Sequence, residues 1–332
     1  MIKYISYFIN EEYNPYHNLA LEEYLLNHVK QDECILYLWQ NEKTVVIGKN
    51  QNPWKECRLK ELEENDGKLV RRLSGGGAVF HDLGNLNFTF LVHKENYNLD
   101  KQLEVILKAV NYLAIPAKKT GRNDITVEGR KFSGNAFYSA GNHSYHHGTI
   151  LINVNMDNLS KYLNVSRDKL VSKGVESVRS RVINLSEYKE GLTIDTMKNE
   201  LIRAIGEVYE GHPIPLTAER INEKEIGELS KKYSSWDWSF GKKIPFNYLI
   251  ERRLEWGNIE IEFRVEAGII KECMAYSDSM DTDFINLIPD AFKSCLFTGE
   301  ALIRRLREIR IVDSNADIIR EDIIGVLKEE QI

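Results

Sequence analysis

The stretch from Arg71 to Asn85 has the residue types best suited to holding an anion. The stretch begins Arg71, Arg72, Leu73, Ser74, Gly75, Gly76, Gly77, Ala78, Val79, Phe80. Glycine lets the backbone approach a ligand closely, and successive N–H groups in such a loop can cradle a phosphate or carboxylate. Arginine adds a planar fork of donors for the same anions. The alternative is a flexible turn with two solvated arginines, but apolar flanks on both sides predict a loop held between strands.

A second cluster places one lysine among glycines. It runs Gly121, Arg122, Asn123, Asp124, Ile125 and then Gly129, Arg130, Lys131, Phe132, Ser133, Gly134, Asn135, Ala136. The ammonium of Lys131 could bridge a carboxylate and a phosphate and neutralise charge as they react, although most lysines are surface residues. Asp124 is either a solvated turn residue or an acceptor for a sugar, an amine or a magnesium shell.

Neither common nucleotide fingerprint fits these clusters. A Walker A loop needs Gly-Lys followed by Ser or Thr, whereas the three Gly-Lys pairs here are followed by Asn, Leu and Lys. The dinucleotide-binding pattern fails because Phe80 stands where its third glycine should be. Any nucleotide is therefore bound by a different kind of glycine loop.

The elements that position these clusters can be read from the hydrophobic pattern. Strands are predicted at Ile35–Trp39, Thr44–Ile47, Leu86–Val92 and Thr149–Val154. Helical spacing appears around Leu21–Val29, Leu103–Val110 and Met197–Val208. The short, turn-rich strand connections favour a mixed α+β sheet over a doubly wound parallel sheet.

The last ninety or so residues read as a separate small α+β domain. A polar stretch between about Gly211 and Pro245 predicts the boundary. Beyond it, Ile259 to Val265 alternate apolar and charged residues, which predicts a hairpin with one solvated face. A helix is predicted around Leu302–Ile309.

Composition limits the class of protein. The chain has 332 residues, 42% hydrophobic and 28% charged, with a formal net charge of −6, so general attraction to nucleic acid is not expected. The four cysteines form no C-x-x-C pair, which favours a reduced, intracellular protein. No apolar run reaches membrane-spanning length and no signal pattern opens the chain, so we expect a cytoplasmic location.

The two clusters, in this order, resemble the lipoate-protein ligase A family. The resemblance extends to Lys173-Gly174-Val175-Glu176-Ser177-Val178-Arg179-Ser180-Arg181-Val182 and to Trp236-Asp237-Trp238, and covers essentially the whole chain. It implies a mixed β-sheet catalytic domain of the biotin/lipoate ligase type over residues 1–244. It also implies a small α+β accessory domain over residues 245–332.

The family joins lipoic acid to a specific acceptor lysine in two steps, through lipoyl-AMP. The resemblance implies ATP and lipoate as substrates, with Mg²⁺ accompanying the ATP through ligands that the sequence does not identify. It implies acceptors with lipoyl domains, namely E2 subunits of 2-oxoacid dehydrogenases or the glycine cleavage H protein, and a monomer.

The resemblance also implies roles for particular residues. ATP is expected at Arg72, Gly77, Ala78, Val79, Phe80 and Lys131. Lys131 is the expected catalytic residue, and lipoate is expected at Lys131, Arg72, Gly75 and Gly76. Asn123 and Asp124 are candidates for the nucleotide or the metal shell.

Three alternatives remain open. An octanoyl or lipoyl transferase carries the acyl group as a thioester on a cysteine. One such family places this cysteine in the stretch that corresponds to Gly141–Gly148, and this sequence has no cysteine there. Biotin ligase uses similar chemistry with a differently patterned loop, and a non-catalytic acyl-adenylate binder would not need Arg72 and Lys131 together.

Two further clusters have uncertain roles. A metal site could be formed by His143, His146 and His147, but we disfavour this hypothesis because neighbouring strand residues point to opposite sides and the segment looks loop-like. The basic residues Lys169, Lys173, Arg179 and Arg181 are either solvated or steer an acidic acceptor.

Overall fold

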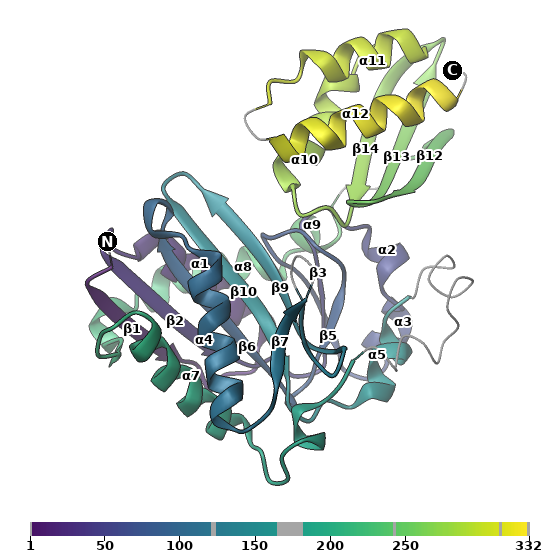
Figure 1. Cartoon of the computed structure of the whole chain (residues 1–332). Helices are drawn as coiled ribbons and strands as arrows, with labels where there is room; N and C mark the ends of the chain where they lie inside the picture. The colour runs from purple at the N-terminus through teal and green to yellow at the C-terminus, as the bar shows by residue number, and fades with distance from the viewer. Residues whose placement is uncertain (1, 121–123, 165–181, 242–243, 312–313, 331–332) are drawn as a thin grey trace. The chain divides into compact units, whose positions relative to one another are not determined.

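The computed structural model describes residues 2–120, 124–164, 182–241, 244–311 and 314–330 (Figure 1). The chain forms two compact units. Unit 1 comprises Met1–Val46, Trp54–Arg71 and Val79–Ser239. Unit 2 comprises Ile47–Pro53, Arg72–Ala78 and Phe240–Ile332. The segment with the three glycines thus groups with the C-terminal residues.

Unit 1 is built on a mixed eight-stranded sheet in the order β11-β1-β2-β6-β10-β9-β8-β7. Strands β11, β1 and β2 are parallel, and the pairs β2–β6, β6–β10, β10–β9, β9–β8 and β8–β7 are antiparallel. The strands are β1 (Tyr4–Ile9), β2 (Glu33–Trp39), β6 (Asn85–His93), β7 (Ala117–Thr120), β8 (Asp124–Val127), β9 (Arg130–Ala140), β10 (His143–Leu151) and β11 (Ile214–Pro215).

Helices cover both faces of this sheet. Alternate residues of β2 and β6, such as Leu36 and Phe88, share a hydrophobic core with α4 (Leu99–Tyr112) and α7 (Ile194–Val208). The opposite face meets α1 (Pro15–His28), because Tyr37 of β2 donates to Asn18 of that helix. Figure 1 shows α4 and α7 beside each other. Because both faces are covered, the strands carry continuous apolar runs.

Side-chain caps start most of the longer helices. Asn14 accepts from Tyr16 N before α1, whose first residue is a proline, and Asn98 accepts from Lys101 N before α4. Helix α8 (Glu223–Ser234) begins the same way after Asn222 and packs on α1. The remaining short helices of unit 1 are α3 (Leu59–Glu63), α5 (Met156–Tyr162), α9 (Trp236–Ser239), η1 (Lys94–Asn96), η2 (Leu185–Glu187) and η3 (Ala218–Arg220), with α2 (Pro53–Glu56) beginning at the unit boundary.

A small sheet in the order β4-β3-β5 carries the glycine loop. Its strands are β4 (Lys68–Arg71), β3 (Thr44–Ile47) and β5 (Val79–His81). The loop leaves β4 and returns as β5 on the other side of β3. As predicted, it joins strands, and Leu69, Val70 and Leu73 beside it are buried.

Unit 2 contains a three-stranded antiparallel sheet and three helices. The elements are β12 (Tyr248–Leu254), β13 (Gly257–Glu266), β14 (Ile269–Ser277), α10 (Thr282–Phe292), α11 (Gly299–Glu308) and α12 (Ser314–Glu329). The predicted hairpin is β13 and β14, and its apolar face shares a core with the helices. The predicted solvated face is wrong, because Glu260 and Glu262 are buried. The segment Ile47–Pro53 lies over Glu260, which accepts from Asn52 at 3.4 Å.

The α+β class with a mixed sheet is confirmed. No helix in the described ranges has the length and apolar character that crossing a bilayer would need. The predicted strand at Thr149–Val154 is shifted, because the strand begins at His143 and ends at Leu151.

Candidate functional site

The glycine loop of unit 2 is shaped from within by Arg72. Arg72 is only 6% exposed. Its Nε donates to Ser74 Oγ at 3.0 Å, and its Nη2 donates to the carbonyls of Gly75 and Gly77 at 2.7 and 2.8 Å. A guanidinium that binds several carbonyls of one loop fixes the loop's curvature and leaves its positive charge there.

The three glycines of this loop differ in what a side chain would meet. A Cβ on Gly75 would lie 2.2 Å from the backbone oxygen of Ser279, so this position excludes any side chain. Gly76 has φ of +88°, a conformation that other residues adopt only with strain. A Cβ on Gly77 would meet no atom within 4 Å. Gly77 is therefore the point of the loop where open space reaches the backbone.

Arg71 points away from this loop and has a structural partner in unit 1. Its Nε and Nη2 donate to the carbonyls of Trp238 and Ser239 at 3.0 and 2.8 Å. Trp238 Nε1 donates back to the carbonyl of Arg71 at 2.8 Å. The two adjacent arginines thus have different tasks, and Arg71 anchors α9 to β4.

Residues after the loop enter β5, an edge strand of the small sheet. Val79 and Phe80 pair with Val46 and Val45 of β3. Phe80 is buried and stacks on Tyr162 with ring centroids 5.1 Å apart. Its side chain is therefore committed to the core, and Phe80 can offer a ligand only its backbone groups. An edge strand directs alternate N–H groups away from its sheet partner.

Lys131 and Asp124 meet in unit 1. Lys131 lies on β9 and Asp124 at the start of β8, and Lys131 Nζ is 2.6 Å from Asp124 Oδ1. The side chains are 37% and 40% exposed. Lys131 O also accepts from Ile183 N at 3.0 Å, which pairs the next described segment to β9.

A β-bulge places this lysine and this carboxylate on one face. Ile125 pairs with Ser133 but Thr126 pairs with Lys131, so Phe132 is the extra residue on β9. Asp124 and Thr126 share a face because strand side chains alternate. Lys131, opposite Thr126, lies on that face too, one diagonal step from Asp124.

The candidate residues divide between the two units. Arg72, Gly75, Gly76, Gly77 and Ala78 belong to unit 2, whereas Val79, Phe80, Asp124 and Lys131 belong to unit 1. Asn123 and the basic residues Lys169, Lys173, Arg179 and Arg181 lie outside the described residues.

The histidine segment is part of β10, so its expected loop-like character is wrong. His146 Nε2 lies 2.8 Å from Asn135 Oδ1, and His147 Nδ1 lies 2.8 Å from Glu22 Oε1. The two rings therefore point to opposite faces, as predicted. Within the described ranges no three His, Cys, Asp or Glu side chains form a cluster that could hold a metal.

The sequence did not indicate the buried polar group around Glu22. This carboxylate is 2% exposed and accepts from Thr89 Oγ1 at 2.6 Å as well as facing His147. Trp39 Nε1 donates to Thr89 Oγ1 at 3.2 Å. The one sequence feature that could have indicated a buried carboxylate is the position of Glu22, three residues from both Leu19 and Leu25, within the apolar stripe of α1.

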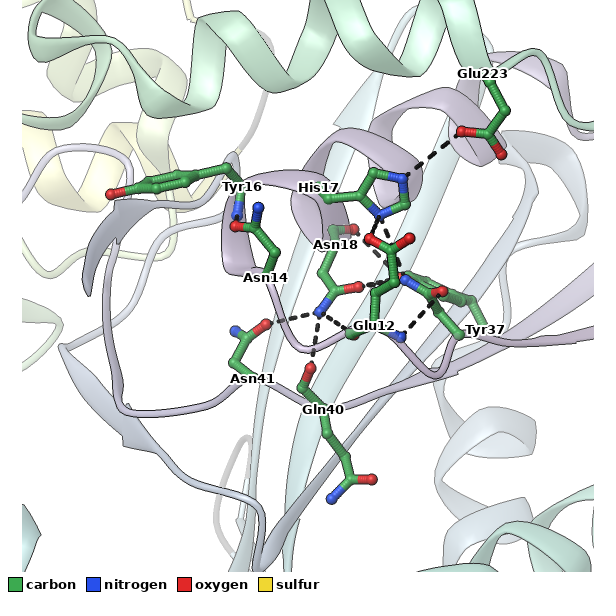
Figure 2. A network of polar contacts seen from close by, with 10 residues as sticks. Glu12, Asn14, Tyr16, His17, Asn18, Tyr37, Gln40, Asn41 and Glu223 are labelled. Atoms are coloured by element: carbon green, nitrogen blue, oxygen red, sulfur yellow. Dashed lines mark hydrogen bonds and ion pairs between the residues drawn. The ribbon is translucent and has the colours of Figure 1, made fainter. Parts of the chain in front are cut away.

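A second polar network ties the start of α1 to the sheet (Figure 2). The buried Asn18 amide donates to the carbonyls of Glu12 and Gln40 at 3.1 and 2.7 Å. It also donates to Asn41 Oδ1 at 3.0 Å, and the Asn41 amide lies 3.2 Å from His81 Nδ1 on β5. This chain of amides fixes the strand that follows the glycine loop.

The four cysteines are free and buried. Burial raises the pKa of Cys34 and of Cys57 to about 12, and it also raises the pKa of Cys273. Such thiols are not ionised near neutral pH and are poor nucleophiles. This disfavours the transferase alternative, which needs a reactive cysteine.

Family models match most of the chain. Residues 14–206 match the lipoyl protein ligase A/B catalytic domain, and residues 243–327 match the bacterial lipoate protein ligase C-terminus. A lipoate-protein ligase A from Psychrobacter cryohalolentis is 42% identical over 286 residues, covering 84% of each chain.

Solved structures of related proteins are similar to this chain over most of its length. LipL1 of P. falciparum in complex with lipoate is 32% identical with a TM-score of 0.84, covering 97% of this chain and 99% of that one. A lipoate-protein ligase A bound with ATP is 26% identical with a TM-score of 0.63, covering 73% and 99%. A bipartite ligase from Thermoplasma acidophilum, described with its E2 lipoyl domain, is 27% identical with a TM-score of 0.65, covering 74% and 100%.

Proposed function

The chain belongs to the lipoate-protein ligase A family, and we propose that its glycine loop and Lys131 carry out the activation of lipoate. It is an ATP-dependent ligase that attaches lipoate to protein. The observation that supports the proposed site most directly is that Lys131 is an accessible cation on β9, in a chain that also carries a glycine loop of a type suited to anions.

The first step joins two anions. A carboxylate oxygen of lipoate attacks the α-phosphorus of ATP, a new P–O bond forms, and the bond to the leaving pyrophosphate breaks. No nucleophilic side chain is required, so alignment and charge neutralisation supply the rate enhancement. Lys131 provides the mobile positive charge for the carboxylate and the α-phosphate, and is the proposed catalytic residue.

The glycine loop supplies fixed donors and a fixed charge. We propose that ATP contacts Arg72, Lys131 and the backbone of Gly77, Ala78, Val79 and Phe80. Gly77 offers open space at the backbone, and β5 is an edge strand. Lipoate is proposed to contact Lys131, Arg72, Gly75 and Gly76. Since the Arg72 donors hold loop carbonyls, its main contribution is to keep the loop in shape.

Magnesium is proposed to arrive with the phosphates of ATP. Phosphates and water supply most Mg²⁺ ligands in such sites, and the described residues offer no three-ligand cluster. Asp124 is the carboxylate proposed to touch the nucleotide or the metal shell, together with Asn123. When bound, the ion would screen phosphate charge.

The second step transfers lipoate to the acceptor. The ε-amine of an acceptor lysine attacks the carbonyl carbon of lipoyl-AMP, a C–N bond forms, the C–O bond to AMP breaks, and the amine loses a proton. We propose E2 lipoyl domains and the glycine cleavage H protein as acceptors. The segment with Lys169, Lys173, Arg179 and Arg181 is proposed to steer an acidic acceptor, an effect that salt should weaken. We also propose that the chain is a cytoplasmic monomer.

Intact-protein mass spectrometry of purified acceptors tests this proposal. With ATP and lipoate, an E2 lipoyl domain or an H protein should gain one lipoyl amide. An acceptor whose target lysine is replaced by arginine is the control and should gain nothing. Modification without ATP, from an acylated carrier protein, would instead support a transferase.

A further inference from the structure

Gly134 of β9 lies directly beneath the side chain of Lys131. A Cβ built on Gly134 would lie 3.0 Å from both Cε and Nζ of Lys131, and its next neighbour would be Thr149 Oγ1 at 3.8 Å. Gly134 pairs with Asp124, the residue that holds the Lys131 ammonium. The lysine therefore crosses the place where a side chain of residue 134 would stand.

Gly134 differs from Gly75 and Gly148 in what an added side chain would meet. At Gly75 and Gly148 the nearest atom to a Cβ would be a backbone oxygen, at 2.2 and 2.5 Å. At Gly134 the obstacle is the flexible end of a lysine, and its φ is not positive. The fold can therefore accept a methyl group at position 134, provided that Lys131 moves.

We propose that Gly134 is a positioning residue for Lys131. The bulge at Phe132 puts Lys131 on the face of Asp124, and the missing side chain at residue 134 leaves the strip between them open. The strip is the surface of β9 and β8 over Gly134, between Lys131 and Asp124, and along it the ammonium extends toward Asp124 before substrates bind. Gly134 N donates to Thr149 Oγ1 at 3.3 Å, which fixes the strip to β10. The inference rests on the proposed role of Lys131 in activation.

The test compares Gly134→Ala with Gly227→Ala. Gly227 lies on α8, and a Cβ there would meet nothing within 4 Å. Lipoate-dependent exchange of pyrophosphate into ATP reports activation. Gly134→Ala should lower the kcat of this exchange about 10- to 100-fold, which is the cost of misplacing a reacting group by about 1 Å. The melting temperature of Gly134→Ala should equal that of the wild type, and Gly227→Ala should keep full activity.

Two readouts separate positioning from general damage. In protein labelled with ¹³C at lysine Cε, the Lys131 resonance, assigned by its loss in Lys131→Ala, should shift in Gly134→Ala. The change should resemble that in Asp124→Asn. In the Lys131→Ala background, Gly134→Ala should cause no further loss of exchange, because its effect passes through the lysine.

Each outcome has a distinct meaning. An equal loss of exchange with and without Lys131, or an unmoved Lys131 resonance, would overturn the positioning role. Full activity of Gly134→Ala together with a large loss in Lys131→Ala would also overturn it, while leaving the proposed function intact. Full activity of Lys131→Ala would remove the proposed role of Lys131, and the positioning role with it.

Discussion

Lys131 is held in a way that lets it change partners. Its ion pair with Asp124 is short, at 2.6 Å, but both side chains are more than a third exposed. Exposed pairs of this kind contribute about 0–1 kcal/mol. The ammonium can therefore leave Asp124 for a substrate carboxylate or phosphate at little cost, while the strand and its bulge keep it in place.

Replacing this lysine is expected to impair activation selectively. Lys131→Ala should lower lipoate-dependent pyrophosphate exchange by about two to three orders of magnitude, the scale seen when one preorganised charge-stabilising group is lost. Lys118→Ala, on the exposed strand β7, is the matched control and should behave as wild type. Near-normal exchange in Lys131→Ala would mean that another cation does this work.

The glycine loop can be tested at Gly77. Valine at Gly76 is a poor probe, because the φ of +88° would strain it and its Cβ would lie 3.0 Å from Arg72 Nη2. Gly77→Ala meets no protein atom, so the melting temperature should not change. If ATP lies against this backbone, the Kd of ATP measured by calorimetry should rise about 10-fold, or about 1.4 kcal/mol. An unchanged Kd would place ATP elsewhere.

The sequence predicted these residues but not their arrangement. The glycine run and Lys131 stood out by type and spacing. The pairing of Lys131 with Asp124 depends on a bulge that a strand pattern does not reveal. The burial of Glu22 could not be predicted, because the sequence does not show whether a charged residue within an apolar stripe has polar partners that allow it to be buried.

At the scale of elements, β10 is a central strand whose histidines are structural. Burial, and to a smaller extent the neighbouring His147, hold the pKa of His146 well below its usual range. His146 is therefore neutral in the folded protein, where Nε2 faces Asn135 Oδ1. In the unfolded chain the same ring titrates near 6.5.

This difference predicts an acid-sensitive contribution to stability. Below about pH 6.5 the unfolded state binds a proton that the folded state excludes, so stability falls as pH falls. Between pH 7.5 and 5.5 this residue should lower the free energy of unfolding by up to about 1.4 kcal/mol, the limit reached when the folded state binds no proton in this range. His146→Gln can still donate to Asn135 and should lose that much less than wild type in urea titrations at the two pH values. Equal losses in the two proteins would contradict this assignment.

The elements themselves were largely predictable. The strands at β2, β3 and β6 and the helices at α1, α4 and α7 follow the hydrophobic periodicity closely. The failures have a common cause. The sequence predicted a solvated face for β13 and a loop for the histidine segment of β10. Glu260 and His146 are instead buried by packing from segments distant in sequence.

At the scale of the whole molecule, the division into two units has a consequence for the site. The loop residues Arg72–Ala78 group with the C-terminal residues, whereas Lys131 stands on the large sheet of unit 1. No sequence pattern could predict this, because it depends on contacts such as that of Gly75 with Ser279. The residues named as candidates for ATP and lipoate therefore belong to both units.

Lipoate-dependent exchange of labelled pyrophosphate into ATP tests the central claim most directly, because it needs no acceptor protein. The wild-type chain should incorporate label into ATP only when lipoate is present. Biotin should not support the exchange, and Lys131→Ala should lose it. Absence of exchange with lipoate, or exchange supported by biotin alone, would contradict the account.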